Sequence, residues 1–125
     1  MMSISPCASF YFLLLRHLFQ KSNESFWVIY LDSALEFIAI QRMATGQPNF
    51  CLVKPQKIFK SALLLDAQAL VLAHNHPSLN VQPTPADIRM TQQLIKKGHL
   101  LQLPILDHII FTDKNYFSFK ENNLI

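Results

Sequence analysis

The run ALVLAH, residues 69–74, constrains the fold of this chain more than any other segment. Five apolar residues follow one another without a break, and a histidine ends the run. A short apolar run of this kind is typical of a strand that is buried on both faces of a sheet. Such a strand needs a covering layer on each face, so the neighbouring segments are expected to supply helices.

Residues 55–67, just before this run, have the spacing of an amphipathic helix. Pro55 suits the first turn of such a helix, because its missing N–H has no partner to lose there. The apolar residues that would share the inner face are Ile58, Phe59, Ala62 and Leu65. We therefore expect a helix that packs on the sheet.

Residues 84–98, after the run, form the clearest helical pattern in the chain. Thr84 suits the N-cap and Pro85 the first helical position. Asp87 falls in the first turn, near the positive end of the helix dipole. The expected inner face consists of Ile88, Thr91, Leu94 and Ile95. Gly98 is expected to end the helix in the left-handed conformation.

The remaining segments complete an alternating order of elements. A first helix is expected at residues 6–20, with an inner face of Phe10, Leu13, Leu14 and Leu18. Strands are expected at residues 25–32, 34–40, 103–113 and 116–119. The first two would be antiparallel across a turn at Asp32–Ser33, and residues 45–49 would form a loop. The order α-β-β-α-β-α-β-β predicts an α/β fold, a single domain over residues 1–125 with a mixed sheet flanked by helices.

Composition and charge narrow the class of protein. Half of the residues are hydrophobic and 15% are charged, which argues against disorder. The net charge is +3, but the basic residues are scattered, so a nucleic-acid partner receives only weak support. Cys7 and Cys51 lack the spacing of a metal site or a disulfide framework, which favours a cytoplasmic protein. The stretch FYFLLLRHLF is too short to span a bilayer, so no membrane association is expected.

The segment LAHNHPSLNVQPTPAD, residues 72–87, carries the candidate chemistry. Alternate residues of a strand point to the same face, so His74 and His76 can approach one metal ion together. Asp87 would join them from the first turn of the next helix. Two histidines and one carboxylate leave a fourth tetrahedral position for water, which is the pattern of catalytic zinc.

A purely structural interpretation of the same residues is also open. Asp87 can close a capping box with Thr84 and serve only the start of the helix. His74 can be a hydrogen-bonded histidine at the end of a strand. Spacing does not decide between the two interpretations. The position after the carboxyl end of an apolar strand favours a functional site, because α/β folds place their sites there.

Two other metal chemistries are set aside. The letters HNH at 74–76 are contiguous, whereas the residues of HNH nucleases are dispersed over a ββα unit. Zinc deaminases require His-x-Glu and Pro-Cys-x-x-Cys. Here His76 stands in the place of that Glu, and the sequence has no Cys-x-x-Cys.

The segments LAHNHPS, PTPAD, MTQQL and LDHIIFTDKNYFSFKENNL resemble the RadC-like branch of the JAB/MPN metalloenzymes. The JAMM motif of that family is a distant Glu, then His-x-His, ten residues, and Asp. His74, His76 and Asp87 match it, and the upstream NESFWVIYLD makes Glu24 the matching acid. The resemblance runs from about Pro6 to the C-terminus and implies a sandwich of the MPN/cytidine-deaminase type.

The resemblance implies that His74, His76 and Asp87 bind Zn²⁺ and that Glu24 is the general base and acid. Thr84 stands where the family usually has a Ser that helps to hold the developing oxyanion. The implied activity is zinc-dependent cleavage of an amide bond in a peptide or isopeptide substrate. The sequence departs from the family pattern in the loop: Leu79 replaces a Gly, and 81–82, Val-Gln, replace a Pro-Thr pair.

The same resemblance leaves two alternatives to a hydrolase function open. One is a non-catalytic metal-binding MPN interaction module, which the altered loop favours. The other is a DNA-repair-associated protein.

Residues outside the motif carry weaker expectations. Asp107 and His108 also match the family, and strand alternation turns them to opposite sides, so we expect a structural role or the orientation of a ligand histidine. His17 and His99 are expected at the surface. Residues 111–119 are expected to be an edge strand or the face of a homodimer.

Overall fold

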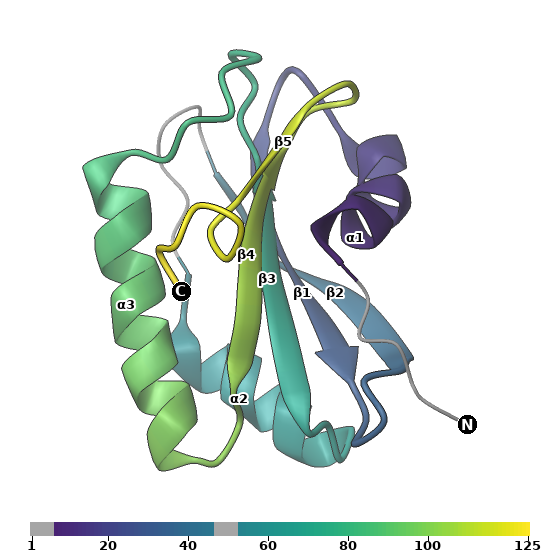
Figure 1. Cartoon of the computed structure of the whole chain (residues 1–125), viewed down its shortest axis with the longest axis vertical. Helices are drawn as coiled ribbons and strands as arrows, with labels where there is room; N and C mark the ends of the chain where they lie inside the picture. The colour runs from purple at the N-terminus through teal and green to yellow at the C-terminus, as the bar shows by residue number, and fades with distance from the viewer. Residues whose placement is uncertain (1–6, 47–52) are drawn as a thin grey trace.

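The computed structural model describes residues 7–46 and 53–125 (Figure 1). Its elements are α1 (Ala8–Leu15), η1 (Arg16–Leu18), β1 (Glu24–Leu31), β2 (Phe37–Gly46), α2 (Pro55–Leu64), β3 (Ala69–Asn75), α3 (Pro85–Leu100), β4 (Ile105–Phe111) and β5 (Tyr116–Ser118). Apart from the short 3₁₀ turn η1, which continues α1, this is the predicted order. In the described part of the chain, no helix is long and apolar enough to cross a membrane.

The strands form one five-stranded sheet in the order β2-β1-β3-β4-β5. β1 is antiparallel to both β2 and β3, β3 is parallel to β4, and β4 is antiparallel to β5. α1 lies on one face of this sheet, and α2 and α3 cover the other (Figure 1). The apolar run forms β3, the central strand, in which every residue is buried. The predicted α/β fold with a mixed sheet between helices is confirmed.

Side chains of the central strands alternate between two cores. In β1, Phe26 and Val28 pack with α2 and α3, whereas Ile29 packs with α1. β3 alternates in the same way, with Leu70 and Leu72 toward α2 and α3. This alternation brings Glu24, the first residue of β1, and His74, near the end of β3, to the α3 side of the sheet.

The predicted inner face of the first helix is wrong at three of its four positions; the fourth, Leu18, lies in η1 and packs partly buried on the α1 side of the sheet. Phe10, Leu13 and Leu14 are exposed, and the residues of α1 that pack on the sheet are Ala8, Tyr11 and Leu15. The helix is apolar on almost every side, so spacing alone does not distinguish the face that packs from the face that does not.

The predicted role of Gly98 is also wrong. Gly98 lies inside α3, and the left-handed residue after the helix is Gln102, with φ 58°. A Cβ atom on Gly98 would lie 2.5 Å from the backbone oxygen of Leu103. The absence of a side chain therefore allows the following chain to pack against the helix, rather than ending the helix.

The predicted turn between β1 and β2 is longer than expected. The Asp32 carboxylate accepts hydrogen bonds from the backbone N–H groups of Ala34 and Glu36, and Leu35 has φ 61°. β2 therefore begins at Phe37 and continues to residue 46, so the first two residues of the predicted loop 45–49 belong to the strand. The rest of that loop and residue 51, a cysteine, lie outside the described residues.

Candidate metal centre

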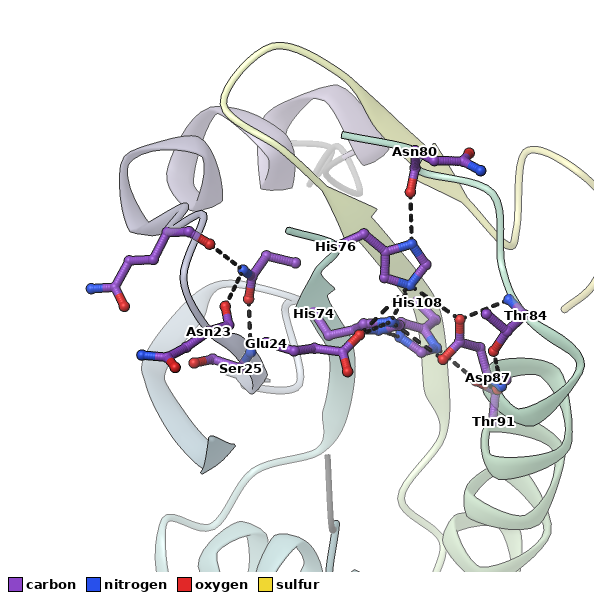
Figure 2. Close-up of polar contacts among 12 residues, drawn as sticks. Asn23, Glu24, Ser25, His74, His76, Asn80, Thr84, Asp87, Thr91 and His108 are labelled. Carbon is purple, nitrogen blue, oxygen red and sulfur yellow. Dashed lines mark hydrogen bonds and ion pairs between the residues drawn. The ribbon is translucent and has the colours of Figure 1, made fainter. Parts of the chain in front are cut away.

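Two histidines meet at the end of β3 that lies beside α3 (Figure 2). His74 is in the strand and His76 follows it directly, and both side chains are buried. Their Nε2 atoms lie 2.9 Å apart. The prediction that strand alternation turns both rings toward one point is confirmed.

Carboxylates approach this pair of histidines from two elements. Asp87, in the first turn of α3, has one oxygen 3.4 Å from His74 Nε2 and the other 3.2 Å from His76 Nε2. Glu24, the first residue of β1, has Oε1 at 3.9 Å from His74 Nε2 and 3.8 Å from His76 Nε2. The ligand atoms of Glu24, His74 and His76 all lie within 4.8 Å of one another, so this group could hold a metal ion.

Asp87 caps its helix and also contacts both histidines. Thr84 is the N-cap of α3: its hydroxyl accepts from Asp87 N at 3.1 Å, and its N–H donates to Asp87 Oδ2 at 2.8 Å. This is the predicted capping box. The same carboxylate contacts both histidines, because the N-terminus of α3 opens directly beside the end of β3.

Asn75, between the two histidines, points to the opposite face of the sheet and holds the segment that carries Glu24. Its Oδ1 accepts from Ser25 N at 2.8 Å, and its Nδ2 donates to the carbonyl oxygens of Gln20 at 2.9 Å and Asn23 at 2.8 Å. Three backbone groups around Glu24 are therefore fixed by one buried amide. The sequence interpretation missed this residue, although its place inside His-x-His was a signal.

Each histidine has a partner for its second ring nitrogen, Nδ1. His76 Nδ1 lies 2.7 Å from the backbone oxygen of Asn80. A carbonyl oxygen only accepts, so His76 carries a proton on Nδ1, and a neutral ring then has its lone pair on Nε2, facing the group. His74 Nδ1 contacts His108 Nε2 at 2.8 Å.

Charges in this group perturb one another. Burial raises the pKa of Glu24 above its ordinary value, and the negative charge of Asp87 adds to this effect while the two histidines oppose it. Burial also favours the protonated form of Asp87, but hydrogen bonds to His74 and His76 hold its pKa well below its usual range. Two acidic groups next to one another therefore have opposite shifts, a feature that clusters at functional sites.

The pKa of His76 is raised above its ordinary value. Burial opposes the charged ring, but the hydrogen bonds to the Asp87 carboxylate and to the Asn80 carbonyl outweigh it, and the charges of Asp87 and Glu24 act in the same direction. The acidic groups around His76 therefore favour a positive charge at this point of the site.

A cavity of about 390 Å³ opens in front of the group. Its apolar wall is formed by Phe26, Val53 and Met90, and its polar rim includes Asn80 and Gln82. Glu24 and Asp87 supply the only charged side chains among the described lining residues, together with His74 and His76 as titratable groups. Thr84 also lines the cavity.

The other histidines and Asp107 lie where the sequence indicated. Asp107 faces away from the group, toward α1, and accepts from Ser118 Oγ at 2.6 Å, His108 N at 2.7 Å and Lys120 N at 3.0 Å. His17 and His99 are exposed. Residues 116–118 form the edge strand β5 of the described sheet.

The sandwich fold and the histidine–carboxylate group define a domain of the JAB/MPN class. A family model, the RadC-like JAB domain, matches residues 4–124. The chain belongs to the RadC-like JAB domain family, as its resemblance to that family implied.

Similar proteins from several organisms carry the name UPF0758 protein, which states no activity. One from Alkaliphilus oremlandii is 37% identical over 113 residues, which are 90% of this chain and 49% of that protein. One from Methanosarcina mazei is 34% identical over 122 residues, 98% of this chain and 53% of that protein. One from Fusobacterium nucleatum is 38% identical over 117 residues. The chain spans about half the length of these relatives.

Proposed function

We propose that this domain is a zinc-dependent hydrolase of amide bonds, with His74, His76 and Asp87 as ligands and Glu24 as the general base and acid. One observation carries the proposal. Ligand atoms at roughly 2.0–2.1 Å from a tetrahedral zinc ion lie about 3.3 Å from each other. Here the two histidine Nε2 atoms lie 2.9 Å apart, and Asp87 approaches His76 Nε2 to 3.2 Å with one carboxylate oxygen and His74 Nε2 to 3.4 Å with the other, so each contact is close to that spacing.

The longer distances of Glu24 distinguish its role from that of Asp87. Its oxygen lies 3.8 and 3.9 Å from the two histidine nitrogens, farther than the oxygens of Asp87, which supports a role beside the ligands rather than among them. The raised pKa of Glu24 also suits a group that takes and returns a proton near neutral pH.

The proposed reaction is the addition of water to a carbonyl carbon followed by loss of an amine. A bound zinc ion would lower the pKa of water and polarise the carbonyl group. Glu24 takes a proton from the attacking water and later delivers it to the leaving nitrogen. The hydroxyl of Thr84, in the wall of the cavity, donates to the oxygen on which negative charge develops.

A peptide or isopeptide is the substrate class that this proposal names, and the cytoplasm is the proposed compartment. The cavity supports an uncharged group near the cleaved bond, because its apolar wall consists of Phe26, Val53 and Met90. Cys7 is an exposed free thiol, which is compatible with a reducing compartment.

Two variants test the proposal and separate the two carboxylates. Asp87→Ala should lose zinc, whereas Glu24→Gln should retain zinc and lose turnover of peptide and isopeptide substrates. Zinc is measured in protein purified without chelator and reloaded with zinc. Glu36→Gln, an exposed acid in the β1–β2 turn, is the matched control and should change neither. A wild-type protein that binds no zinc after reloading contradicts the proposal.

A non-catalytic metal-binding module is the second candidate, and the conformation of Leu79 favours it. Leu79 has φ 68°, a backbone region that suits glycine, and it lies in the loop between His76 and Asp87. Its neighbours Ser78 and Asn80 line the cavity, so a strained backbone here would change the shape of the space that a substrate enters. Wild-type protein that binds zinc but cleaves no amide substrate would support this candidate.

A further inference from the structure

A buried chain of hydrogen bonds runs from His74 to the helix that carries Asp87 (Figure 2). His74 Nδ1 lies 2.8 Å from His108 Nε2, and His108 Nδ1 lies 2.6 Å from Thr91 Oγ1. Thr91 Oγ1 in turn donates to the backbone oxygen of Asp87 at 2.8 Å. This series of hydrogen bonds connects His74 with Asp87, two of the proposed metal ligands, through residues of β4 and α3.

The direction of the protons in this chain follows from its last member. A carbonyl oxygen only accepts, so the single hydroxyl proton of Thr91 points to the oxygen of Asp87. Thr91 Oγ1 then offers only lone pairs to His108, and His108 Nδ1 must carry the proton and donate. If Thr91 instead donated its proton to His108, Thr91 Oγ1 and the backbone oxygen of Asp87 would face each other at 2.8 Å without a proton between them.

His108 is neutral in this place. Its side chain is fully buried, and its ring stacks on Phe119 with the ring centroids 4.6 Å apart. Its nitrogens contact an imidazole and a hydroxyl, neither of which balances a positive charge. A neutral ring with its proton on Nδ1 has a lone pair on Nε2, so His108 accepts a hydrogen bond from His74 Nδ1.

We infer that Thr91 is a positioning residue for the metal centre: through His108 it fixes the tautomer of His74 in which Nε2 is free of a proton and faces the ligand group. The inference rests on the proposed function, because it takes His74 as a ligand through Nε2. Neither Thr91 nor His108 is itself a ligand. Outer partners of this kind change metal affinity by roughly 10–100-fold when removed.

Thr91→Val tests the inference, and Thr91→Ser is its matched control. Valine keeps the shape of the buried side chain but removes the acceptor for His108 Nδ1. The proton of His108 then moves to Nε2 and is donated to His74 Nδ1, so His74 is protonated on Nε2, where the metal would bind. Zinc affinity, measured by competition with a chelator, should fall by roughly 10–100-fold. Thr91→Ser keeps the hydroxyl and should bind zinc as the wild type does.

A second measurement separates this role from a merely structural one. Nitrogen-15 NMR of the metal-free protein should find His108 protonated on Nδ1 in the wild type and in Thr91→Ser, and on Nε2 in Thr91→Val. Lost packing would lower thermal stability without moving that proton. A wild-type His108 protonated on Nε2, or unchanged zinc affinity in Thr91→Val, would overturn the inference. If wild-type protein binds no zinc, the proposed function fails, and the NMR measurement still decides the tautomer.

Discussion

The two proposed ligand histidines, two residues apart, are held by different regions of the molecule. His74 is held by the core, where its Nδ1 contacts the buried ring of His108, which is in turn held by the hydroxyl of Thr91. His76 is held by the loop, where the backbone oxygen of Asn80 accepts from Nδ1. Both arrangements leave Nε2 facing the ligand group. One end of the site therefore depends on side-chain identity, and the other depends on backbone shape.

This difference explains which departures from the family pattern the site can accept. The changed loop residues 79, 81 and 82 lie on the side where a carbonyl oxygen orients the histidine, and every residue type has that oxygen. On the core side, a substitution that removes the Thr91 hydroxyl or the His108 ring would not be equally neutral, because these groups supply a specific donor and acceptor. Four predictions test this contrast.

Removing each histidine should have the largest effect. His74→Ala and His76→Ala should both lose zinc binding, by more than the roughly 10–100-fold that removal of an outer partner produces. They should differ in the metal-free protein, because His74→Ala leaves the buried His108 Nε2 without its partner, at a cost of about 1–3 kcal/mol. Chelator competition and urea unfolding measure the two effects. Equal unfolding free energies would show that core and loop hold their histidines alike.

Asn75→Ala should destabilise the fold next most strongly. Three backbone groups lose a buried partner, so the free energy of unfolding should fall by about 2–4 kcal/mol. Turnover should fall as well, because Glu24 is no longer held in place, while zinc is retained. Asn80→Ala is the control on the loop side: its exposed side chain accepts from Gln82 N, and the loss should stay below about 1 kcal/mol. A larger loss for Asn80→Ala would reverse the contrast.

Zinc affinity should weaken as the pH falls through the raised pKa of His76. The ring must lose its proton to bind metal, so the apparent affinity should drop about tenfold per pH unit once His76 is protonated. The folding stability of the metal-free protein should change with pH in the opposite direction. The contact between protonated His76 and Asp87 stabilises the fold at low pH, and this contribution is lost as the pH rises through the pKa of His76. Zinc titrations between pH 8 and about 5.5, spanning the ordinary pKa of histidine, check this. An affinity independent of pH would contradict it.

Leu79→Gly should have the smallest effect and the opposite sign. Glycine adopts φ 68° without strain, so the free energy of unfolding should rise by about 0.5–1 kcal/mol despite the greater freedom of the unfolded chain. Ser78→Gly in the same loop is the matched control. Its φ is not positive, so glycine there should only destabilise. Loss of stability in Leu79→Gly, measured by thermal unfolding, would show that the leucine side chain contributes more than its backbone strain costs.

Much of the fold could be predicted because local signals agree with the final packing. The apolar run at 69–74 became the central strand, and Thr84 with Asp87 marked the start of α3. The inner face of α1 could not be predicted, since a helix apolar on most sides gives no periodic signal. The role of Gly98 was predicted wrongly because it depends on a contact after the end of the helix. The backbone oxygen of Leu103 lies where a Cβ atom on residue 98 would be.

The candidate site divides in the same way. His74 and His76 follow from strand alternation, and Asp87 follows from the helix start. Glu24 has no local signal, because it lies 50 residues before His74 and meets it only through the pairing of β1 with β3. Thr91 was assigned to the inner face of its helix, which is correct, but its bond to His108 depends on how α3 sits against β4.

Asn75 also has a consequence for how the sheet is assembled. Its three backbone partners lie on the segment 20–25, and they can all be reached only when Phe26 is opposite His74. A slip of one residue between these strands would turn each side chain of β1 to the wrong face and leave the amide without partners. Asn75 therefore specifies the register of β1 against β3. The same strand pairing that forms the centre of the sheet also brings Glu24 to the histidines.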